Sequence, residues 1–380
     1  MNGYTLTLPF VKSATAGFVK ADKVREILSL SLVSGKNCIM FGPGGHGKSE
    51  MTAAILAAVT GATSRTQMFG EGMDEARLYG GINLGKLNDT ENPVIEYHPE
   101  RSFLSWDFAV FEELFDAPTS VLMTLKDTLT SKALRNGEQQ FPMRTQSIVC
   151  ATNREPGEVA EIGAAAQALI ERFPLQLRVA WGSYYSADYL EMFRTVGRVE
   201  DASISLKELE VLKYRAKKAI VPEAVQRILA EMIANAVASG VTISPRSAMY
   251  AQDLVKASAV INGRDTATKD DIQAIKYLPG CDELAAKISE EIEAAVKRAE
   301  AEGKIRDAES RLRELQSQFQ ASQSSPIKLL QVAVLAAQFG DSVANMTVTD
   351  NLTQRRKSLR DATSKLAADA QASALSATRV

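Results

Sequence analysis

The sequence predicts a three-layer α/β domain with a parallel sheet, followed by a small all-helical lid and a helical C-terminal extension. In the first part of the chain, short apolar runs alternate with helical patterns, which indicates alternating strands and helices. The pattern then becomes helical, and in the last part the composition shifts to Ala, Glu, Lys, Gln and Ser. We therefore expect domains over residues 1–182, 183–281 and 282–380.

Three apolar runs in the first domain predict buried strands of the parallel sheet. They are NCIMF (37–41), DFAVF (107–111) and QSIVCAT (146–152), and each is nearly free of polar interruptions. A helix is expected before the first strand, over residues 21–32. The dipeptide Asn136-Gly137 predicts a β-hairpin just before the third strand.

The two later domains are expected to consist of helices. Pro222 and Pro245 each stand near the start of a helical pattern, where proline is favoured. Two amphipathic runs in the extension are one residue out of phase across Gly303, so they form either a hairpin or one helix with a phase slip. Further helices are expected over 327–339 and 351–377. The apolar positions of the two runs are Ala285, Ile288, Ile292, Ala295 and Ala299, then Ile305, Ala308, Leu312, Leu315 and Phe319.

The bulk composition is that of a globular protein and disfavours several functions. Lys plus Arg (44) nearly balances Asp plus Glu (46), so no overall charge favours nucleic acid or membranes. Cys38, Cys150 and Cys281 lie far apart and lack the spacing of metal or redox sites. The N-terminus lacks a secretory pattern, and no apolar run approaches the ~18 residues of a membrane span. We expect a cytoplasmic protein.

The strongest functional signal is Gly-Pro-Gly-Gly-His-Gly-Lys-Ser at positions 42–49, between the first strand and a helical pattern. It matches the phosphate-binding pattern G-x-x-x-x-G-K-[ST] in the context that this motif requires. Its backbone N–H groups and the helix N-terminus would surround phosphate oxygens. Lys48 is expected to reach the β- and γ-phosphates of ATP, and the Ser49 hydroxyl to hold Mg²⁺. The expected nucleotide-binding residues are Gly42, Pro43, Gly44, Gly45, His46, Gly47, Lys48 and Ser49.

Two acids, Glu112 and Glu113, end the second predicted strand. A nucleotide hydrolase needs one acid to hold Mg²⁺ through water and another to orient the attacking water. We assign the metal to Glu112, although Asp is the usual residue there and the extra methylene group would move the carboxylate. We assign the water to Glu113. On its own, such a pair at a strand end would more often be a solvated charge.

Asn153 ends the third predicted strand. Its amide would hydrogen-bond the attacking water or the γ-phosphate. An isolated Asn after a strand is ordinarily a turn residue. The catalytic assignment therefore depends on the phosphate loop and on the acid pair.

Together these segments resemble the MoxR family of AAA+ ATPases over roughly residues 10–280. The segments that carry the resemblance are GPGGHGKS, FEELFDAPTSVLMTLKDTLTSKAL, CATN, ALIERF and SPRSA, in that order. The resemblance implies a Rossmann-like P-loop ATPase domain with a helical lid, assembled as a hexameric ring with ATP between subunits. It also implies that Arg172 acts on the neighbouring subunit's ATP and that Arg246 contacts the γ-phosphate. A protein partner with a von Willebrand factor A domain is implied as well.

Several alternatives remain at this stage. A nucleic-acid motor is disfavoured by the near-neutral charge, although the last segment holds Arg355, Arg356, Lys357 and Arg360. An inactive nucleotide-binding scaffold is disfavoured because the expected catalytic set is present. The glycine-rich segment 70–86 reads as a flexible insert, either an ordinary surface loop or a client contact. The C-terminal extension either docks a partner or stabilises the ring.

Overall fold

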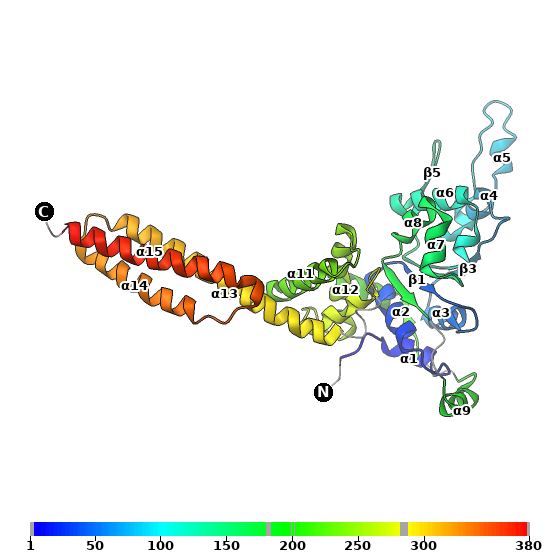
Figure 1. Ribbon diagram of the computed structural model, residues 1–380. Coiled ribbons are helices and arrows are strands. Elements are labelled where there is room, and N and C mark those ends of the chain that lie inside the picture. The colour runs from blue at the N-terminus through cyan, green and yellow to red at the C-terminus, as the bar shows by residue number, and fades with distance from the viewer. Residues whose placement is uncertain (1–3, 180–183, 199, 201, 282–287, 378–380) are drawn as a thin grey trace. The chain divides into compact units, whose positions relative to one another are not determined.

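The computed structural model describes residues 4–179, 184–198, 200, 202–281 and 288–377 (Figure 1). The chain divides into two compact units. Unit 1 comprises Met1–Gln226 and Ala236–Ile288, and unit 2 comprises Arg227–Asn235 and Ser289–Val380. The domain boundaries expected near residues 182 and 282 lie outside the described residues, as does Ala285, and they stay predictions.

A five-stranded parallel sheet forms the centre of unit 1. The predicted strands are present as β1 (Cys38–Phe41), β4 (Phe108–Glu112) and β7 (Ser147–Ala151). They lie side by side, and β3 (Ser64–Met68) and β8 (Leu175–Arg178) flank them in the order β3-β4-β7-β1-β8. The three central strands are almost entirely buried, which explains why their sequences are continuously apolar.

Helices cover both faces of this sheet, so the predicted three-layer architecture is correct (Figure 1). On one face, Phe41, Phe111 and Cys150 share a core with Leu125 and Leu169 of the covering helices. The helices of unit 1's α/β part are α1 (Pro9–Ala14), α2 (Asp22–Ser34), α3 (Lys48–Ala57), α6 (Thr119–Ser131), α7 (Pro156–Ile162) and α8 (Ala164–Ile170). Two short strands of two residues each, β2 (Val59–Thr60) and β9 (Ile204–Ser205), pair in parallel.

The predicted hairpin contacts the segment that follows the glycine-rich insert. The hairpin consists of β5 (Ala133–Asn136) and β6 (Gln139–Pro142), joined through a turn at Gly137 with φ 56°. The insert, expected to be flexible, contains the short helices α4 (Glu75–Leu78) and α5 (Leu84–Leu87). Backbone hydrogen bonds close it, and the Asn136 side chain donates to the Ile95 carbonyl at 2.9 Å. Single turns of 3-10 helix follow at Pro99–Arg101, Phe103–Ser105 and Leu114–Asp116.

The expected lid region is helical in the structure. It contains α9 (Ser186–Thr195), α10 (Leu206–Lys218), α11 (Glu223–Ala238), α12 (Pro245–Ile261) and the 3-10 helix η4 (Lys269–Tyr277). The helices α11 and α12 begin where Pro222 and Pro245 predicted. Fully buried Asp271 links α12 to η4, because it accepts two bonds from Arg264 and one from Ser258.

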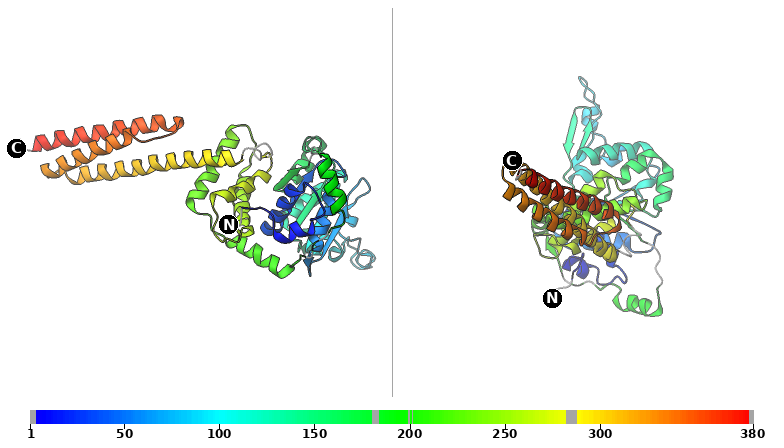
Figure 2. Two further views of the ribbon diagram at one scale, coloured as in Figure 1. Left: turned by 90° about the horizontal axis from the view of Figure 1, so that it is seen from below. Right: turned by 60° about the vertical axis from the view of Figure 1, so that its left-hand side comes forward.

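Unit 2 contains three long helices that pack side by side (Figure 2). They are α13 (Ile288–Ala321), α14 (Pro326–Ala344) and α15 (Thr353–Ala377), with one 3-10 turn at Asp350–Leu352. The two out-of-phase runs of the sequence thus form a single helix of 34 residues. Leu312 and Leu315 of that helix share a core with Val343 and Leu366.

The helix α14 has one property that the sequence prediction did not include. By length and composition it could cross a membrane, a property that core helices of water-soluble proteins share. Its residues Leu329, Val332, Ala336 and Val343 are buried within unit 2.

Replacing Leu315 with Ala should destabilise unit 2 selectively. The side chain is 1% exposed, so truncation leaves a cavity that costs about 2–5 kcal/mol. Both tryptophans, Trp106 and Trp181, precede residue 227 in the sequence, so fluorescence reports unit 1, whereas far-ultraviolet circular dichroism reports the helices of both units. In urea, the circular-dichroism transition should begin earlier while the fluorescence midpoint stays fixed. An equal shift of both signals would show that the units unfold as one.

Candidate nucleotide-binding site

The phosphate loop (residues 42–49) connects β1 to α3 in a conformation that requires glycine. Gly42, Gly45 and Gly47 have φ values of 124°, 82° and 68°, which residues with a Cβ rarely adopt. A Cβ at Gly42 would also overlap the carbonyl oxygen of Val179, and one at Gly47 would press on the Phe18 ring at 3.1 Å. The glycines therefore allow the chain to turn closely against its neighbours.

Lys48, the first residue of α3, is held inside this loop. Its side chain is only 6% exposed, and its Nζ donates to the carbonyl oxygens of Gly42 and, at 2.9 Å, Pro43. Burial lowers the pKa of Lys48, and the charges of Glu113 and Glu155 oppose this effect. A bound phosphate would offer this ammonium group an anionic partner in place of neutral carbonyls.

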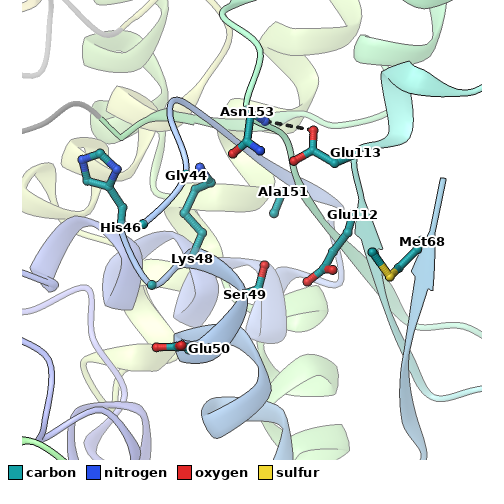
Figure 3. Close-up of a pocket in the computed structure, with 12 residues that line it drawn as sticks. Gly44, His46, Lys48, Ser49, Glu50, Met68, Glu112, Glu113, Ala151 and Asn153 are labelled. Atoms are coloured by element: carbon teal, nitrogen blue, oxygen red, sulfur yellow. Dashed lines mark hydrogen bonds between the residues drawn. The ribbon is translucent and has the colours of Figure 1, made fainter. Parts of the chain in front are cut away.

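A cavity of about 330 Å³ opens beside the loop (Figure 3). Backbone from the loop, the first turn of α3 and the carboxyl ends of β3, β4 and β7 surround it. This is the edge of a parallel α/β sheet at which ligands generally bind. Its lining residues are Gly44, Gly45, His46, Gly47, Lys48, Ser49, Glu50, Met68, Glu112, Glu113, Ala151 and Asn153.

Both predicted acids reach the cavity. Glu112 is the last residue of β4, and Glu113 follows it with a left-handed backbone, φ 51°. The Glu113 N–H donates to the Ala151 carbonyl at 3.0 Å, which keeps the chain beside β7. Glu113 Oε2 accepts the N–H of Asn153 at 3.1 Å and lies 3.5 Å from the Thr152 hydroxyl (Figure 3).

The amide of Asn153 lies between the acid pair and the phosphate loop. Its Oδ1 is 3.5 Å from the position that a Cβ of Gly44 would occupy. In Figure 3 the side chain stands beside Gly44 and Lys48, above the cavity. An amide so placed can donate to a phosphate oxygen or to a water molecule.

The donors around the cavity fit Mg²⁺ bound together with a nucleotide. Ser49 and Glu112, the two residues expected to hold the metal, both line it. In the described part of the chain, no group of three or more His, Cys, Asp and Glu side chains could hold an ion by itself. That donor set suits Mg²⁺, which usually keeps several waters and shares phosphate oxygens with few protein ligands.

The two predicted arginines do not line this cavity. Arg172 lies after α8, where its guanidinium donates to Thr130 Oγ1 at 3.1 Å and to the Ala168 carbonyl at 3.0 Å. Arg246 is exposed in the first turn of α12. Within one chain, the structure therefore brings the loop, the acids and Asn153 together, but not the arginines.

Sequence reasoning missed Ala151, which lines the cavity, and three further residues of the site. Glu50 lies in the first turn of α3 and Met68 at the end of β3, and both line the cavity. Thr152, which is buried, approaches Glu113. Met68 was detectable in principle, since it lies opposite Glu112 on the neighbouring strand, but the short and mostly exposed β3 gave no apolar signal.

The glycine-rich loop, the parallel sheet and the helical lid define a nucleotide-binding protein of the AAA+ class. A family model described as the MoxR domain in MoxR-vWA-beta-propeller ternary systems matches residues 6–236. A model of the AAA lid domain matches residues 229–278. The chain belongs to this MoxR family of AAA+ ATPases, as its sequence motifs predicted.

Comparisons with individual proteins agree with this fold. The chain is similar to two uncharacterized proteins of Methanocaldococcus jannaschii, MJ0079 (21% identical) and MJ0812 (19% identical). Each match covers 69% of this chain, and 66% and 68% of those proteins, respectively. A crystal structure of a candidate ATPase from Cytophaga hutchinsonii superposes with a TM-score of 0.57 at 18% identity, over 76% of this chain and 92% of that one. This last similarity shows the fold alone.

Replacing Gly42 with Ala should weaken nucleotide binding by about tenfold or more, because a methyl group there must displace the loop from Val179. Fluorescent-ATP titration measures the loss. Gly61→Ala is the matched control: Gly61 also has a positive φ, 79°, but a Cβ there has nothing within 4 Å. If both variants bind ATP as the unaltered chain does, close packing at Gly42 does not shape the site.

Proposed function

We propose that the protein is a Mg²⁺-dependent ATPase that works as a ring, expected to be hexameric, and remodels, activates or matures a partner protein complex. The observation that carries this proposal is the convergence of Lys48, Glu112, Glu113 and Asn153 on one cavity beside a phosphate loop. Each has the chemistry that one step of phosphoryl transfer needs.

In the reaction, water attacks the γ-phosphorus of ATP and the bond to the β–γ bridging oxygen breaks, giving ADP and phosphate. Lys48 would donate to the β- and γ-phosphate oxygens. Glu113 would orient the attacking water and accept its proton, and Asn153 would fix the water or the γ-phosphate. Bound Mg²⁺, held by Ser49 and through water by Glu112, would neutralise charge on the phosphates.

Ring assembly is proposed because the arginine expected to take part in catalysis does not reach the cavity of its own chain. Arg172 contacts Thr130 and the Ala168 carbonyl rather than the cavity of its own chain. A guanidinium that stabilises transition-state charge must approach the γ-phosphate. We therefore assign Arg172 to the ATP of a neighbouring subunit, and Arg246 to the γ-phosphate after the lid moves.

The family description supports the choice of partner, since it names ternary systems of MoxR, vWA and beta-propeller proteins. We propose a partner with a von Willebrand factor A domain, a cytoplasmic location, and docking of that partner on the C-terminal extension. The alternative function, a nucleic-acid motor, is disfavoured by the contacts that two arginines make in the C-terminal extension. Arg355 pairs there with Glu302 and Glu309, and Arg356 donates to the Met346 carbonyl.

Glu113→Gln should separate binding from turnover. The amide keeps the size of the side chain but cannot accept a proton, so we expect hydrolysis to fall by about 10²–10⁴-fold with ATP still bound. Lys48→Ala should instead weaken ATP binding by about 10–100-fold, the value of a charge-assisted hydrogen bond. Nucleotide titration and steady-state phosphate release measure both effects. Native turnover in Glu113→Gln would exclude Glu113 as the base.

Mixing two inactive variants should restore some activity if Arg172 acts between subunits. Arg172→Ala subunits keep an intact cavity, and Lys48→Ala subunits keep an intact arginine, so some mixed interfaces hold both. Phosphate release is measured for each variant alone and for mixtures at concentrations where subunits exchange. No recovery, despite exchange shown by labelled subunits, would mean that Arg172 acts within its own chain or not at all.

A further inference from the structure

The amide of Asn153 depends for its position on the backbone that carries it. Asn153 is exposed, and among the residues that the structure describes its side chain makes no hydrogen bond. A group that acts on a reacting phosphate must be held to within about 0.5 Å by its surroundings. The contacts that hold the turn after β7, residues 152–155, therefore decide whether Asn153 is placed to act.

An ion pair connects this turn to the segment that follows β4. The Arg154 guanidinium donates twice to Asp116 Oδ1, from Nε at 3.0 Å and from Nη2 at 2.7 Å. Asp116 is the last residue of the 3-10 turn that directly follows Glu113. The other two residues of that turn, Leu114 and Phe115, are buried in the core of the α/β domain. Arg154 is thus attached to a segment that the core holds in place.

The ion pair closes a circuit of contacts that contains both Glu113 and Asn153. The Asp116 N–H donates to the Glu113 carbonyl at 2.9 Å. From Asp116 the circuit passes through the ion pair to Arg154, whose own N–H donates to Thr152 Oγ1 at 3.2 Å. It returns through the Asn153 N–H, which donates to Glu113 Oε2 at 3.1 Å. The geometry of this circuit sets the separation between the proposed base and the amide.

The alternative is an ordinary surface ion pair. The side chains of Arg154 and Asp116 are 39% and 38% exposed, and pairs of this kind stabilise a fold only slightly. This pair, however, joins two segments that lie 38 residues apart in the sequence, one with each catalytic group. Because its contribution to stability is small, its loss should leave the fold intact. A displacement of about 1 Å at a catalytic group, in contrast, can lower a rate by about a hundredfold.

We propose that Arg154 and Asp116 are positioning residues, whose ion pair holds the turn with Asn153 at the distance from Glu113 that ATP hydrolysis requires. The inference rests on the proposed function, since it concerns the same site. Neither Arg154 nor Asp116 lines the cavity, so the pair acts through the two catalytic groups and not on the nucleotide. Loss of the pair therefore changes turnover and leaves ATP affinity nearly as it was.

Replacing Arg154 with Ala in the full chain should lower kcat by about tenfold or more, because the turn can then move away from Glu113. Titrated ATP affinity should change less than about twofold, since the phosphate loop is untouched. The matched control is Arg178→Ala. Arg178 also donates from Nε and Nη2 to one carboxylate oxygen, that of Glu155, at 3.0 and 2.8 Å. It ties the same turn to β8 instead of to the segment of Glu113, so kcat should stay within about threefold.

A double-mutant cycle separates the ion pair from the charge of each residue. Arg154→Ala removes a positive charge near the site, and Asp116→Ala removes a negative one, so a purely electrostatic role would change kcat in opposite directions. If the pair positions the turn, both variants should lower kcat to a similar degree. The double variant should then fall no further, because each single substitution already removes the same contact.

A further measurement does not depend on hydrolysis. Amide hydrogen exchange in the nucleotide-free protein reports how often the Asn153 N–H loses its bond to Glu113. In Arg154→Ala the peptide that contains this amide should exchange faster by about fivefold or more, because the circuit is open. In Arg178→Ala its exchange should stay close to that of the unaltered chain.

The proposal is overturned if Arg154→Ala keeps the native kcat, if Arg178→Ala lowers kcat equally, or if the effects of Arg154→Ala and Asp116→Ala add in the double variant. Unchanged exchange at Asn153 in Arg154→Ala also overturns it. Failure of the proposed function gives a different result. In that case the unaltered chain releases no phosphate from ATP, while Arg154→Ala still speeds exchange at Asn153.

Discussion

The register of three parallel strands is the constraint on which the nucleotide site depends. Ala151 of β7 lies opposite both Met40 of β1 and Glu112 of β4, so β4 and β7 end at the same level and β1 continues for one residue beyond it. The Thr152 N–H continues the pairing by donating to the Met40 carbonyl at 3.1 Å. Because side chains alternate along a strand, a slip of one residue would turn Glu112 away from the loop. The apolar residues that bury the sheet therefore also position the acids.

A second constraint lies at the point where β4 ends. Adjacent residues of a strand point to opposite faces, yet Glu112 and Glu113 both line the cavity. The left-handed backbone of Glu113 resolves this conflict by turning its carboxylate toward β7. Such a conformation costs about 1–3 kcal/mol for a residue other than glycine, and here the Ala151 and Asn153 hydrogen bonds offset it. Strain of this kind is common where function fixes a side chain.

Several elements of the α/β core were predictable because a single local feature of the sequence determines each of them. Continuous apolar runs predicted β1, β4 and β7. Asn136-Gly137 predicted the hairpin, although only Gly137 lies in the turn and Asn136 is the last residue of β5. Other features depend on a balance between opposing free-energy contributions, whose sizes cannot be read from the sequence. Gly303 marks the phase break in the extension, and a glycine costs about 1 kcal/mol inside a helix. Packing along α13 outweighs that cost, so one helix forms instead of a hairpin.

The two arginines could not be placed in the same way, because neither lines the cavity of its own chain and the role proposed for Arg172 needs a second subunit. Apart from the two arginines, the residues proposed to bind ATP lie at one edge of one sheet, where buried Lys48 already has the carbonyls of Gly42 and Pro43 as partners. Binding would exchange those neutral acceptors for phosphate oxygens without unfolding the loop. The proposed hydrolysis needs a further positive charge, which Arg172 cannot supply while it bonds to Thr130 and Ala168. In the proposed arrangement a single chain would hold ATP, and contact with a neighbour would decide when the ATP is cleaved. Such a division would make turnover report on assembly, which is the property that a remodelling ring requires.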